Sequence, residues 1–401
     1  MPLKVVIIGS GVAGLATAAI LRKKANVTIL ERSTEERIAG GQGVGLGPNA
    51  TKILDSMGYD RVQSHAVTSK GFKAYDVSNG NLVKKIPMDV VGEYGADWLM
   101  TLRKDFRAEL LRLATEHDES TRPTLRYNCK VENIDVHEGA VTLQGGEVLS
   151  ADVIVVASGI HTDLKEKIVG NDRFKATPTG QTIFRFLVSA SNATKVVGKL
   201  PEWWDPKEGG YLSIMRTDDG TNRALITYPC CDFKYVNFSC AFPNHYLKSS
   251  AGESWFTDGN LDEVLEIFKD FPAPYADFMK HAEEIKVWEL RDHDPLPTYV
   301  QGRAVLIGDA AHAMAPFQGQ GGAQALEDAE GLRILIENNI SRGDIPEALK
   351  RWDKARRPRA SQVQENTRQA SRKLNEVDSM KNMAYNWTYD GIFEALKDLE
   401  T

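Results

Sequence analysis

The sequence has few of the residues that build disulfide scaffolds and metal sites. Only four of its 401 residues are cysteines, and none of them stands in a CxxC pair. The eight histidines show no HxxxH or HExxH spacing, so neither a structural zinc site nor a zinc-dependent hydrolase is expected. We therefore expect reduced, mostly structural thiols and no bound metal.

A strong charge of one sign is also missing. The chain has 49 Lys and Arg against 55 Asp and Glu, a formal net charge of −6, and no long basic run. Nucleic acids and anionic membranes attract clustered positive charge, so neither is an expected partner. The predicted partner is a small molecule.

The uncharged stretch from residue 5 to residue 21 is short for a membrane span and contains three glycines. Only Lys4 precedes it as a charged leader, so a secretion signal is not expected either. We expect a cytoplasmic protein without a membrane span. Its length and its 42% hydrophobic content predict two or three domains with a substantial core.

A glycine pattern follows the first predicted strand. Residues 5–8 form a β-branched run that is typical of a buried parallel strand, and Gly-Ser-Gly-Val-Ala-Gly follows directly. A helix to about Lys24 and a strand at 27–30 complete a βαβ unit. This order predicts a dinucleotide site in which Gly9 makes the tight turn, Gly11 lets a pyrophosphate approach, and Gly14 lets the helix pack on the strand.

The residues around this turn favour FAD or NAD over NADP. The helix N-terminus at Val12 and Ala13 offers N–H groups and a positive dipole to phosphates. Glu31 ends the second strand, where it would accept hydrogen bonds from ribose hydroxyls and repel a 2′-phosphate. The neighbouring Arg32 alone does not reverse this preference. The pattern does not choose between FAD and NAD.

A second candidate site follows a strand predicted at residues 303–307. Asp309 stands at the carboxyl end of that strand, where ligands collect, and it can accept a hydrogen bond from a polyol chain. Pro316 and the turn Gly319-Gln-Gly321-Gly322 allow the backbone to approach a flat ligand. The helix predicted at 323–338 would present its positive N-terminus there, which suits a ring that becomes anionic on reduction.

With both motifs, the chain resembles the single-component FAD-dependent aromatic hydroxylases, the group A flavoprotein monooxygenases. Their second FAD motif runs G-D-A-A-H, then proline, then G-Q-G, as it does from Gly308 onward. The resemblance implies that Asp309 binds the ribityl chain of a tightly bound FAD and that Gly319 to Gly322 hold the pyrimidine edge of the isoalloxazine. It also places the segment 43–49, with Val44, beside the flavin and makes Arg103 a cofactor-binding arginine.

Two further stretches extend the resemblance. Residues 158–165 stand where the family has D-G-x-x-S-x-x-R, but they depart from it at the Asp, Ser and Arg positions. Residues 386–391 resemble the C-terminal segment of the salicylate hydroxylase and 3-hydroxybenzoate hydroxylase branch. Because the chain has only one GxGxxG pattern, NAD(P)H is expected to visit the flavin transiently rather than to stay bound.

The predicted fold class is α/β, with a Rossmann-like FAD-binding domain and a second, mainly antiparallel substrate sheet, like that of p-hydroxybenzoate hydroxylase. The sheet is expected to contain strands at 182–187, 211–215, 223–228 and 234–242, with 71–88 joining it. Helices are expected at 346–357 and 360–377, with a break or kink at Pro358. The expected division is 1–70, 99–177 and 291–375 for the FAD-binding domain, 71–98 and 178–290 for the substrate domain, and 376–401 for a C-terminal segment.

Two residues of the predicted sheet are candidates for catalysis. Arg185 shares a strand face with Ile183 and Leu187, and a buried arginine needs an anionic partner. That partner is either a structural carboxylate or a phenolate or carboxylate substrate. Tyr228, held extended before Pro229, could orient or deprotonate a phenol, or it could be a core tyrosine.

The resemblance implies an NAD(P)H-driven monooxygenase that hydroxylates a small phenolic or carboxylated aromatic with O₂ through a flavin hydroperoxide. One alternative is an epoxidase or dearomatising oxygenase that acts on a secondary metabolite. Another is a flavin-binding sensor without turnover. A full second domain favours an enzyme, and a monomer or homodimer is expected.

Overall fold

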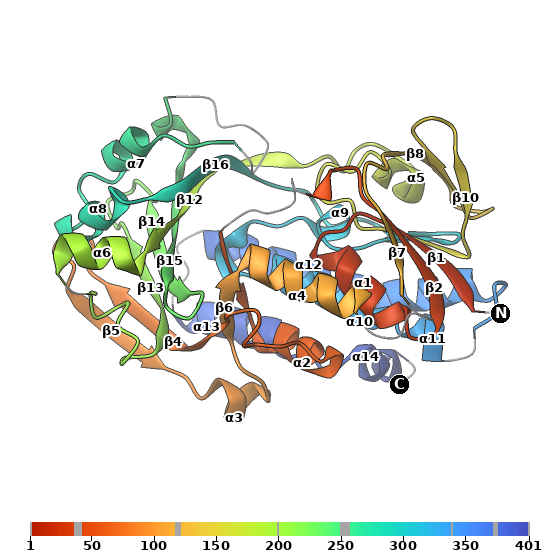
Figure 1. The fold of residues 1–401 in the computed structure, drawn as a ribbon, viewed down its shortest axis with the longest axis horizontal. Coiled ribbons are helices and arrows are strands. Elements are labelled where there is room, and N and C mark those ends of the chain that lie inside the picture. The colour runs from red at the N-terminus through yellow and green to blue at the C-terminus, as the bar shows by residue number, and fades with distance from the viewer. Residues whose placement is uncertain are drawn as a thin grey trace.

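The computed structural model describes residues 2–35, 42–116, 122–198, 200–248, 257–337, 340–371 and 376–399. Two sheets lie at opposite ends of the long axis, with helices between and around them (Figure 1). The sheet of six strands contains the N-terminal strand. The larger sheet, built mainly from the middle of the chain, forms the other end. This arrangement confirms the predicted α/β class with a second, mainly antiparallel sheet.

The six-stranded sheet has the order β17-β18-β11-β1-β2-β7, and only its β17–β18 pair is antiparallel. Ile8 pairs with both Leu30 and Val156, and Val156 pairs with Leu306, so four neighbouring strands end at one edge. The strands are β1 (Leu3–Ile8), β2 (Ala25–Leu30), β7 (Thr124–Arg126), β11 (Val153–Val156), β17 (Val300–Gln301) and β18 (Ala304–Leu306).

Three helices cover this sheet and carry the candidate motifs. Helix α1 (Val12–Leu21) packs between α4 (Arg103–Thr115) and α10 (Gly321–Gly331), and nine of its ten residues are buried. Such all-round burial explains why α1 shows no amphipathic pattern.

Two predicted helix boundaries were wrong. Helix α1 ends at Leu21 rather than near Lys24, and the helix expected at 323–338 begins at Gly321 and ends at Gly331. A short helix, α11 (Ile334–Glu337), follows, and residue 338 lies outside the described residues. Gly331 has low helix propensity, and an ideal Cβ placed on it would lie 2.5 Å from Trp352 Nε1. Close packing therefore requires the glycine at which the helix ends.

The larger sheet has the order β16-β12-β15-β14-β13-β4-β6-β3, with β5 beside β4, and all its pairs except β13–β4 are antiparallel. All the strands predicted for it are present, whereas β3, β6 and β16 were missed. Its strands are β3 (Gly43–Leu46), β4 (Val67–Tyr75), β5 (Leu82–Pro87), β6 (Leu99–Leu102), β12 (Thr177–Ser189), β13 (Gly210–Arg216), β14 (Ala224–Cys230), β15 (Tyr235–Pro243) and β16 (Glu283–Asp292).

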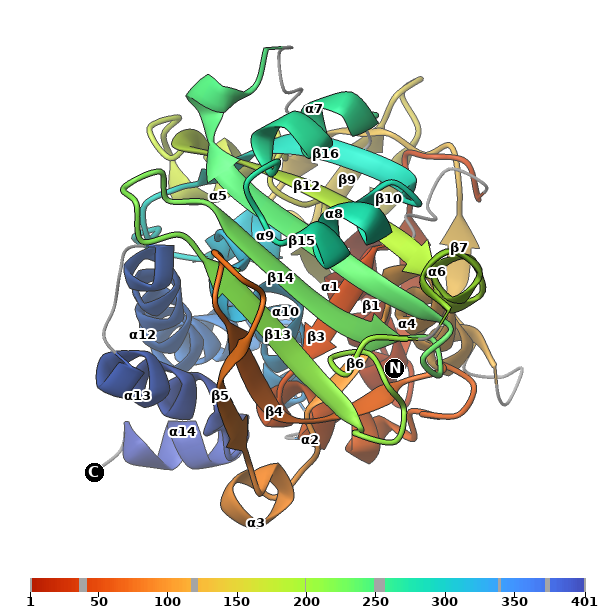
Figure 2. The same ribbon diagram turned by 90° about the vertical axis from the view of Figure 1, so that its left-hand side faces the viewer.

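The two faces of the larger sheet differ. On the outer face, Phe184 stacks on Phe242 and Phe186 stacks on Phe238. Helices α7 (Leu261–Ile267) and α8 (Ala273–Met279) cover this aromatic layer, and they lie toward the viewer in Figure 2. The opposite face carries Arg185 and Tyr228 and packs against β3.

The remaining elements are smaller. A three-stranded sheet that the sequence analysis missed contains β8 (Val131–Asp135), β9 (Ala140–Leu143) and β10 (Val148–Ser150). The other helices are α2 (Pro48–Met57), α3 (Val90–Tyr94), α5 (Lys165–Val169), α6 (Ala190–Val197), α9 (Asp309–His312) and α14 (Ile392–Asp398). Among the described residues, no helix is both long and apolar enough to cross a bilayer.

Of the break or kink predicted at Pro358, the break was wrong. Helix α12 runs without interruption from Ile345 to Ser371, with Pro358 inside it. A proline removes one backbone hydrogen bond, but Arg356 and Arg359, on either side of it, both bind the buried Glu327. These contacts anchor both halves of the helix. Residues 372–375 lie outside the described residues, and Val377 falls in α13 (Glu376–Trp387).

The division of the chain into two domains and a C-terminal segment stays a prediction. Its boundary between residues 70 and 71 falls inside β4. That strand pairs with β6 at residues 67 and 68 and with β5 from residue 71 onward, so it runs from one predicted domain into the other.

Candidate functional site

The loops that carry the sequence motifs meet at one edge of the parallel sheet. Gly9 follows β1, Ser158 follows β11 by two residues, and Gly308 follows β18 by two residues. An ideal Cβ on Gly9 would lie 2.4 Å from the Ala157 carbonyl oxygen, and one on Gly308 would lie 3.0 Å from Ala13 Cβ. The fold therefore brings the two glycine motifs, 300 residues apart, into contact.

The glycines of these motifs fall into two groups. Gly9 has φ +109°, and an ideal Cβ on Gly14 would lie 2.0 Å from the Gly9 carbonyl oxygen, so the chain's own packing requires both. By contrast, an ideal Cβ on Gly11, Gly319 or Gly322 would meet no atom within 4 Å. These three glycines border open space. A backbone that a ligand approaches closely must have such open space beside it.

The second motif is shaped so that an acid faces a helix N-terminus. Gly308 (φ +59°) turns the chain into α9, whose first residue, Asp309, has an exposed side chain. An ideal Cβ on Gly321, at the start of α10, would lie 3.8 Å from Asp309 Oδ1. Pro316 is exposed in the short 3₁₀ helix η4 (Pro316–Gln318), and the left-handed Gly319 (φ +63°) follows it.

Buried side chains support this second motif from behind. Asp328 accepts hydrogen bonds from the Gly308 N–H (2.8 Å) and from His312 Nε2 (2.6 Å), and it pairs with Arg356. Burial alone would raise the pKa of Asp328, but His312 and Arg356 outweigh it and lower the pKa. The ionised Asp328 thus fixes the turn that presents Asp309.

Arginines of α4 lie beside the first motif. Arg107 donates to the carbonyl oxygen and the hydroxyl of Ser10, both at 3.2 Å. Arg103 lies one helical turn earlier, and its burial lowers its pKa. The neighbouring charge of Asp309 opposes this shift, whereas Arg185 and Arg107 add to it. The site therefore concentrates positive charge, which suits an anionic cofactor.

The sequence analysis missed Arg107. The sequence spacing could have revealed it, because Arg107 lies four residues after Arg103 and therefore on the same face of the helix. The other predicted cofactor residues lie where the pattern put them: Val12 and Ala13 at the start of α1, Glu31 directly after β2, Arg32 exposed beside it, and Val44 in β3.

The carboxylate of Glu31 holds the first turn closed. Its Oε2 accepts hydrogen bonds from the backbone N–H and the hydroxyl of Ser10, both at 2.9 Å. Its Oε1 accepts one from the Ser33 N–H at 2.9 Å. The acid thus lies against the glycine turn.

Arg185 and Tyr228 come together on the inner face of the larger sheet. Arg185 Nη2 donates to the Gly43 carbonyl oxygen and, at 3.2 Å, to the Tyr228 hydroxyl. Burial raises the pKa of Tyr228 to about 12, although Arg185 opposes the rise. Tyr228 is therefore protonated at neutral pH and can donate a hydrogen bond.

Among the residues that the structure describes, Arg185 does not form the structural ion pair that was one of its two interpretations. Across the described ranges, no carboxylate lies within ion-pair distance of it, and its buried Nε has no hydrogen-bond partner. A buried donor atom without a hydrogen-bond partner is costly. A bound anion would remove that cost.

Asn237 was not predicted and lies in the same cluster. Its Oδ1 accepts a hydrogen bond from the Gly43 N–H at 2.8 Å, so Asn237 and Arg185 together hold both backbone groups of Gly43. An ideal Cβ on Gly43 would lie 2.6 Å from a ring carbon of Tyr228. The glycine thus lets β3 lie directly against the sheet.

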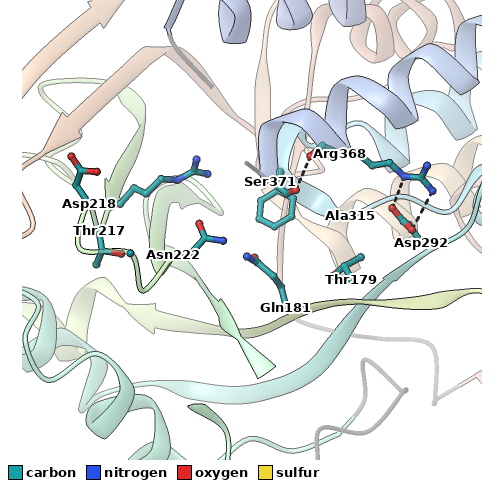
Figure 3. Close-up of a pocket in the computed structure, with 12 residues that line it drawn as sticks. Thr179, Gln181, Thr217, Asp218, Asn222, Asp292, Ala315, Arg368 and Ser371 are labelled. Carbon is teal, nitrogen blue, oxygen red and sulfur yellow. Dashed lines mark hydrogen bonds and ion pairs between the residues drawn. The ribbon is translucent and has the colours of Figure 1, made fainter. Parts of the chain in front are cut away.

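A cavity of about 680 Å³ opens next to the second motif (Figure 3). It lies between the beginning of β12, the turn between β13 and β14, and the end of α12. Figure 3 shows the Arg368–Asp292 ion pair (2.8 Å) at one side and Asp218 and Asn222 at the other. The lining residues are Thr179, Gln181, Arg216, Thr217, Asp218, Gly220, Asn222, Asp292, Ala315, Phe317, Arg368 and Ser371.

Neither Arg185 nor Tyr228 is among the residues that line this cavity. Gln181 is, and it lies four residues before Arg185 on the same face of β12, because side chains alternate along a strand. Sequence reasoning missed every lining residue. Ala315 and Phe317 flank Pro316 of the second motif, but the other lining residues come from distant segments that no local pattern connects.

Comparisons with known proteins agree with this geometry. A family model described as an FAD binding domain matches residues 2–367. The chain belongs to this family. The FAD-dependent monooxygenase phomE′ of Diaporthe leptostromiformis is 31% identical over 331 residues, which cover 81% of each protein. Hispidin-3-hydroxylase of Neonothopanus nambi is 29% identical over 374 residues, 90% of this chain and 86% of that protein.

A solved structure of a salicylate hydroxylase substrate complex superposes with a TM-score of 0.78 at 26% identity. The match covers 99% of this chain and 97% of that one. The resemblance to the group A flavoprotein monooxygenases is thus confirmed, and the chain is an FAD-dependent enzyme of that group.

Proposed function

We propose that this enzyme uses NAD(P)H and O₂ to hydroxylate an aromatic substrate that binds in the 680 Å³ cavity. The observation that carries the proposal is the position of this cavity. Ala315 and Phe317, which line it, flank Pro316 of the second FAD motif. A ligand in the cavity would therefore lie next to the flavin-binding turn.

The described residues fit FAD. Gly11 and the N–H groups of Val12 and Ala13 would receive the pyrophosphate, and Glu31 the ribose hydroxyls. Arg103 and Asp309 would lie along the phosphate and ribityl portion, and Gly319, Gly321 and Gly322 would border the ring with Pro316 and Val44. The remaining assigned residue, Arg32, is exposed beside Glu31. When bound, FAD would supply the redox chemistry, passing electrons from NAD(P)H to O₂ and one oxygen atom to the substrate.

Arg185 and Tyr228 do not line the cavity, but Gln181 does and shares a face of β12 with Arg185. We propose that a substrate reaching past Gln181 meets this pair, which favours its anionic form. Oxygen transfer to an aromatic ring is easier when a phenol carries more negative charge. Arg185 has an unused Nε donor in a buried position, and Tyr228, protonated at neutral pH, can donate to a phenolate. The pair would thus offer the substrate anion a hydrogen bond from the Tyr228 hydroxyl and the positive charge of Arg185.

The cavity accommodates two substrate classes. Its volume lies within the roughly 300–1,000 Å³ typical of pockets for drug-sized ligands. A small phenolic or carboxylated ring fits, as the salicylate hydroxylase neighbour suggests. A larger aromatic metabolite, including one that is epoxidised or dearomatised, also fits, and the many polar lining side chains favour a substrate with several hydrogen-bonding groups.

The test of this function is FAD-reconstituted protein assayed with a panel of hydroxybenzoates, hydroxynicotinates and larger phenols. We expect NAD(P)H oxidation to accelerate with at least one compound and an oxygenated product to form with little peroxide. Flavin binding without acceleration or product by any panel member would instead support a flavin-binding sensor. The Asp309→Ala variant should retain less FAD, and unchanged flavin content would remove Asp309 from the site.

Arg185→Gln tests the role of the arginine. Loss of a buried charge contact costs about 2–5 kcal/mol, so kcat/KM for the aromatic substrate should fall roughly thirtyfold or more while slow basal NAD(P)H oxidation continues. Arg173→Gln, at an exposed arginine, is the matched control. Full turnover by Arg185→Gln would show that the residue serves only to hold Gly43.

A further inference from the structure

The end of α13 contacts both segments that are proposed to lie beside the isoalloxazine. One segment is β3 with its continuation to Asn49, and the other is the turn 316–322. Asn386 reaches the second and Trp387 reaches the first. These two adjacent residues therefore stand between the two segments.

Asn386 is fully buried and uses each of its polar groups. Its Nδ2 donates to Gln318 Oε1 in η4, directly before the left-handed Gly319. Its Oδ1 accepts a hydrogen bond from Asn366 Nδ2 at 2.9 Å, and its carbonyl oxygen accepts one from Arg359 Nη2 at 3.0 Å. The contact to Gln318 is thus held from α12 and is not a loose surface contact.

Trp387 limits the position of the other segment. An ideal Cβ on Gly47 would lie 2.6 Å from Trp387 Nε1, so the indole lies against the backbone where β3 leads into α2. Trp98 and Tyr94 fix the indole, with ring centroids 5.2 and 5.3 Å away. A rigid aromatic side chain is therefore wedged against the first segment.

A second set of contacts joins the same parts through buried charges. Arg359 pairs with Glu327 of α10, and Glu327 accepts a hydrogen bond from Asn49 Nδ2 at 2.7 Å. Glu330 accepts hydrogen bonds from the Tyr389 hydroxyl (2.7 Å) and the Ile392 N–H (3.0 Å). The segment 386–392 is thus anchored to α10 at two points beyond Gln318.

From these contacts we infer that Asn386 and Trp387, anchored through Tyr389 and Ile392, are positioning residues that set the separation between β3 and the turn 316–322, and so the width and polarity of the flavin ring site. The inference rests on the proposed placement of the ring between those segments. A segment that only stabilised the fold would not need to begin with a buried amide bonded to the residue before Gly319.

The experiment compares Asn386→Leu, Gln318→Met and the double variant, with Thr388→Ala as a control at an exposed position. The readouts are the Kd for FAD, the visible spectrum and reduction potential of the bound flavin, and the melting temperature of the apoprotein. We expect each single variant to raise the Kd about five- to tenfold, as loss of a buried hydrogen bond implies, and to shift the flavin absorption bands. The double variant should have a Kd for FAD no higher than that of the single variant with the larger effect, because both substitutions remove the same Asn386–Gln318 hydrogen bond.

Trp387→Phe keeps the proposal testable if Asn386→Leu does not fold. It preserves the ring packing and removes the indole edge at Gly47, so we expect a smaller spectral shift without a large loss of apoprotein stability. A lower melting temperature with FAD affinity, spectrum and potential all unchanged would overturn the inference. Protein that binds FAD with these variant-dependent shifts but oxidises no aromatic substrate would instead refute the proposed function and leave this inference intact.

Discussion

The two glycine turns that meet at the edge of the parallel sheet are stabilised in different ways. The first, at residues 9–14, is held largely by its own backbone, since Gly9 and Gly14 touch and the Gly9 N–H donates to the Leu30 carbonyl oxygen at 2.8 Å. The second, at 308–322, is held by buried side chains from elsewhere, such as Asp328 and Arg356. One turn depends on the absence of side chains and the other on their presence.

This difference predicts how each turn fails. Replacing a glycine of the first turn introduces atoms where backbone already lies. Replacing a supporting residue of the second turn leaves buried charges with fewer partners. The first failure is steric and local, whereas the second is electrostatic and spreads through α10 and α12.

Arg356→Met should have the largest effect. Arg356 is fully buried and pairs with Glu327 (2.6 Å) and Asp328 (3.0 Å), so its loss leaves two carboxylates in a low-dielectric interior. Breaking a buried pair costs about 3–5 kcal/mol of unfolding free energy. Urea unfolding of the apoprotein measures it, with Arg357→Met, a partly exposed neighbour paired with Asp353, as the control. Equal effects of the two variants would show that the network contributes no more than a surface pair.

The same contrast explains what could be predicted from the sequence. The first turn was recognised together with the structural reason for each glycine, because strand, turn and helix are contiguous and their geometry is local. The second was recognised by its motif, but its support was not. Asp328, Arg356 and Asn386 are distant in sequence from Gly308, and no periodic pattern connects them.

The continuous helix through Pro358 illustrates the same limit. Local rules predict a break there, and the tertiary contacts of Arg356 and Arg359 override them. The cavity lining was unpredictable for a similar reason, since Gln181, Asn222 and Arg368 meet only in the folded chain.

Gly14→Ala and Gly11→Ala should separate fold from cofactor binding. At Gly14 a new methyl group would lie 2.0 Å from a carbonyl oxygen, so we expect a loss of about 1–3 kcal/mol in apoprotein stability from overpacking. At Gly11 the methyl group would enter open space, so the apoprotein should melt normally while FAD affinity falls. Thermal melting with and without FAD tests both. A destabilised Gly11→Ala apoprotein with normal FAD affinity would contradict the division of the glycines into two groups.

Mild acid should lower the stability of the region beside the second turn, where Gln364 Nε2 donates to the carbonyl oxygens of His293 (3.3 Å) and Ala313 (3.1 Å). Burial, aided by Lys165, lowers the pKa of His293 from 6.5 to about 4. His293 is therefore neutral in the folded state near neutral pH. Its contribution to the free energy of unfolding is fully present above pH 6.5 and is lost as the pH falls toward 4. At pH 5.5 the loss is about 1.4 kcal/mol.

Melting temperatures at pH 7.0 and 5.5 provide the measurement. His293→Asn should lose less stability than the parent chain over this interval, because an amide does not titrate there. The same fall in both proteins would assign the acid sensitivity to other groups. Lys165 and Asp292, which both influence the pKa of His293, would then be examined next.

Ser10→Ala should lower the free energy of unfolding least among these variants. The Ser10 hydroxyl donates to Glu31 and accepts a hydrogen bond from Arg107, so it links two side chains that support the first turn. Its removal leaves the backbone bonds from the Ser10 N–H to Glu31 and from Arg107 to the Ser10 carbonyl oxygen intact. We expect a loss of about 0.5–1.5 kcal/mol by urea unfolding, the net contribution of a typical hydrogen bond. A loss as large as that of Arg356→Met would mean that the first turn also depends on its side chains, and that the two turns differ in sequence pattern but not in how they are stabilised.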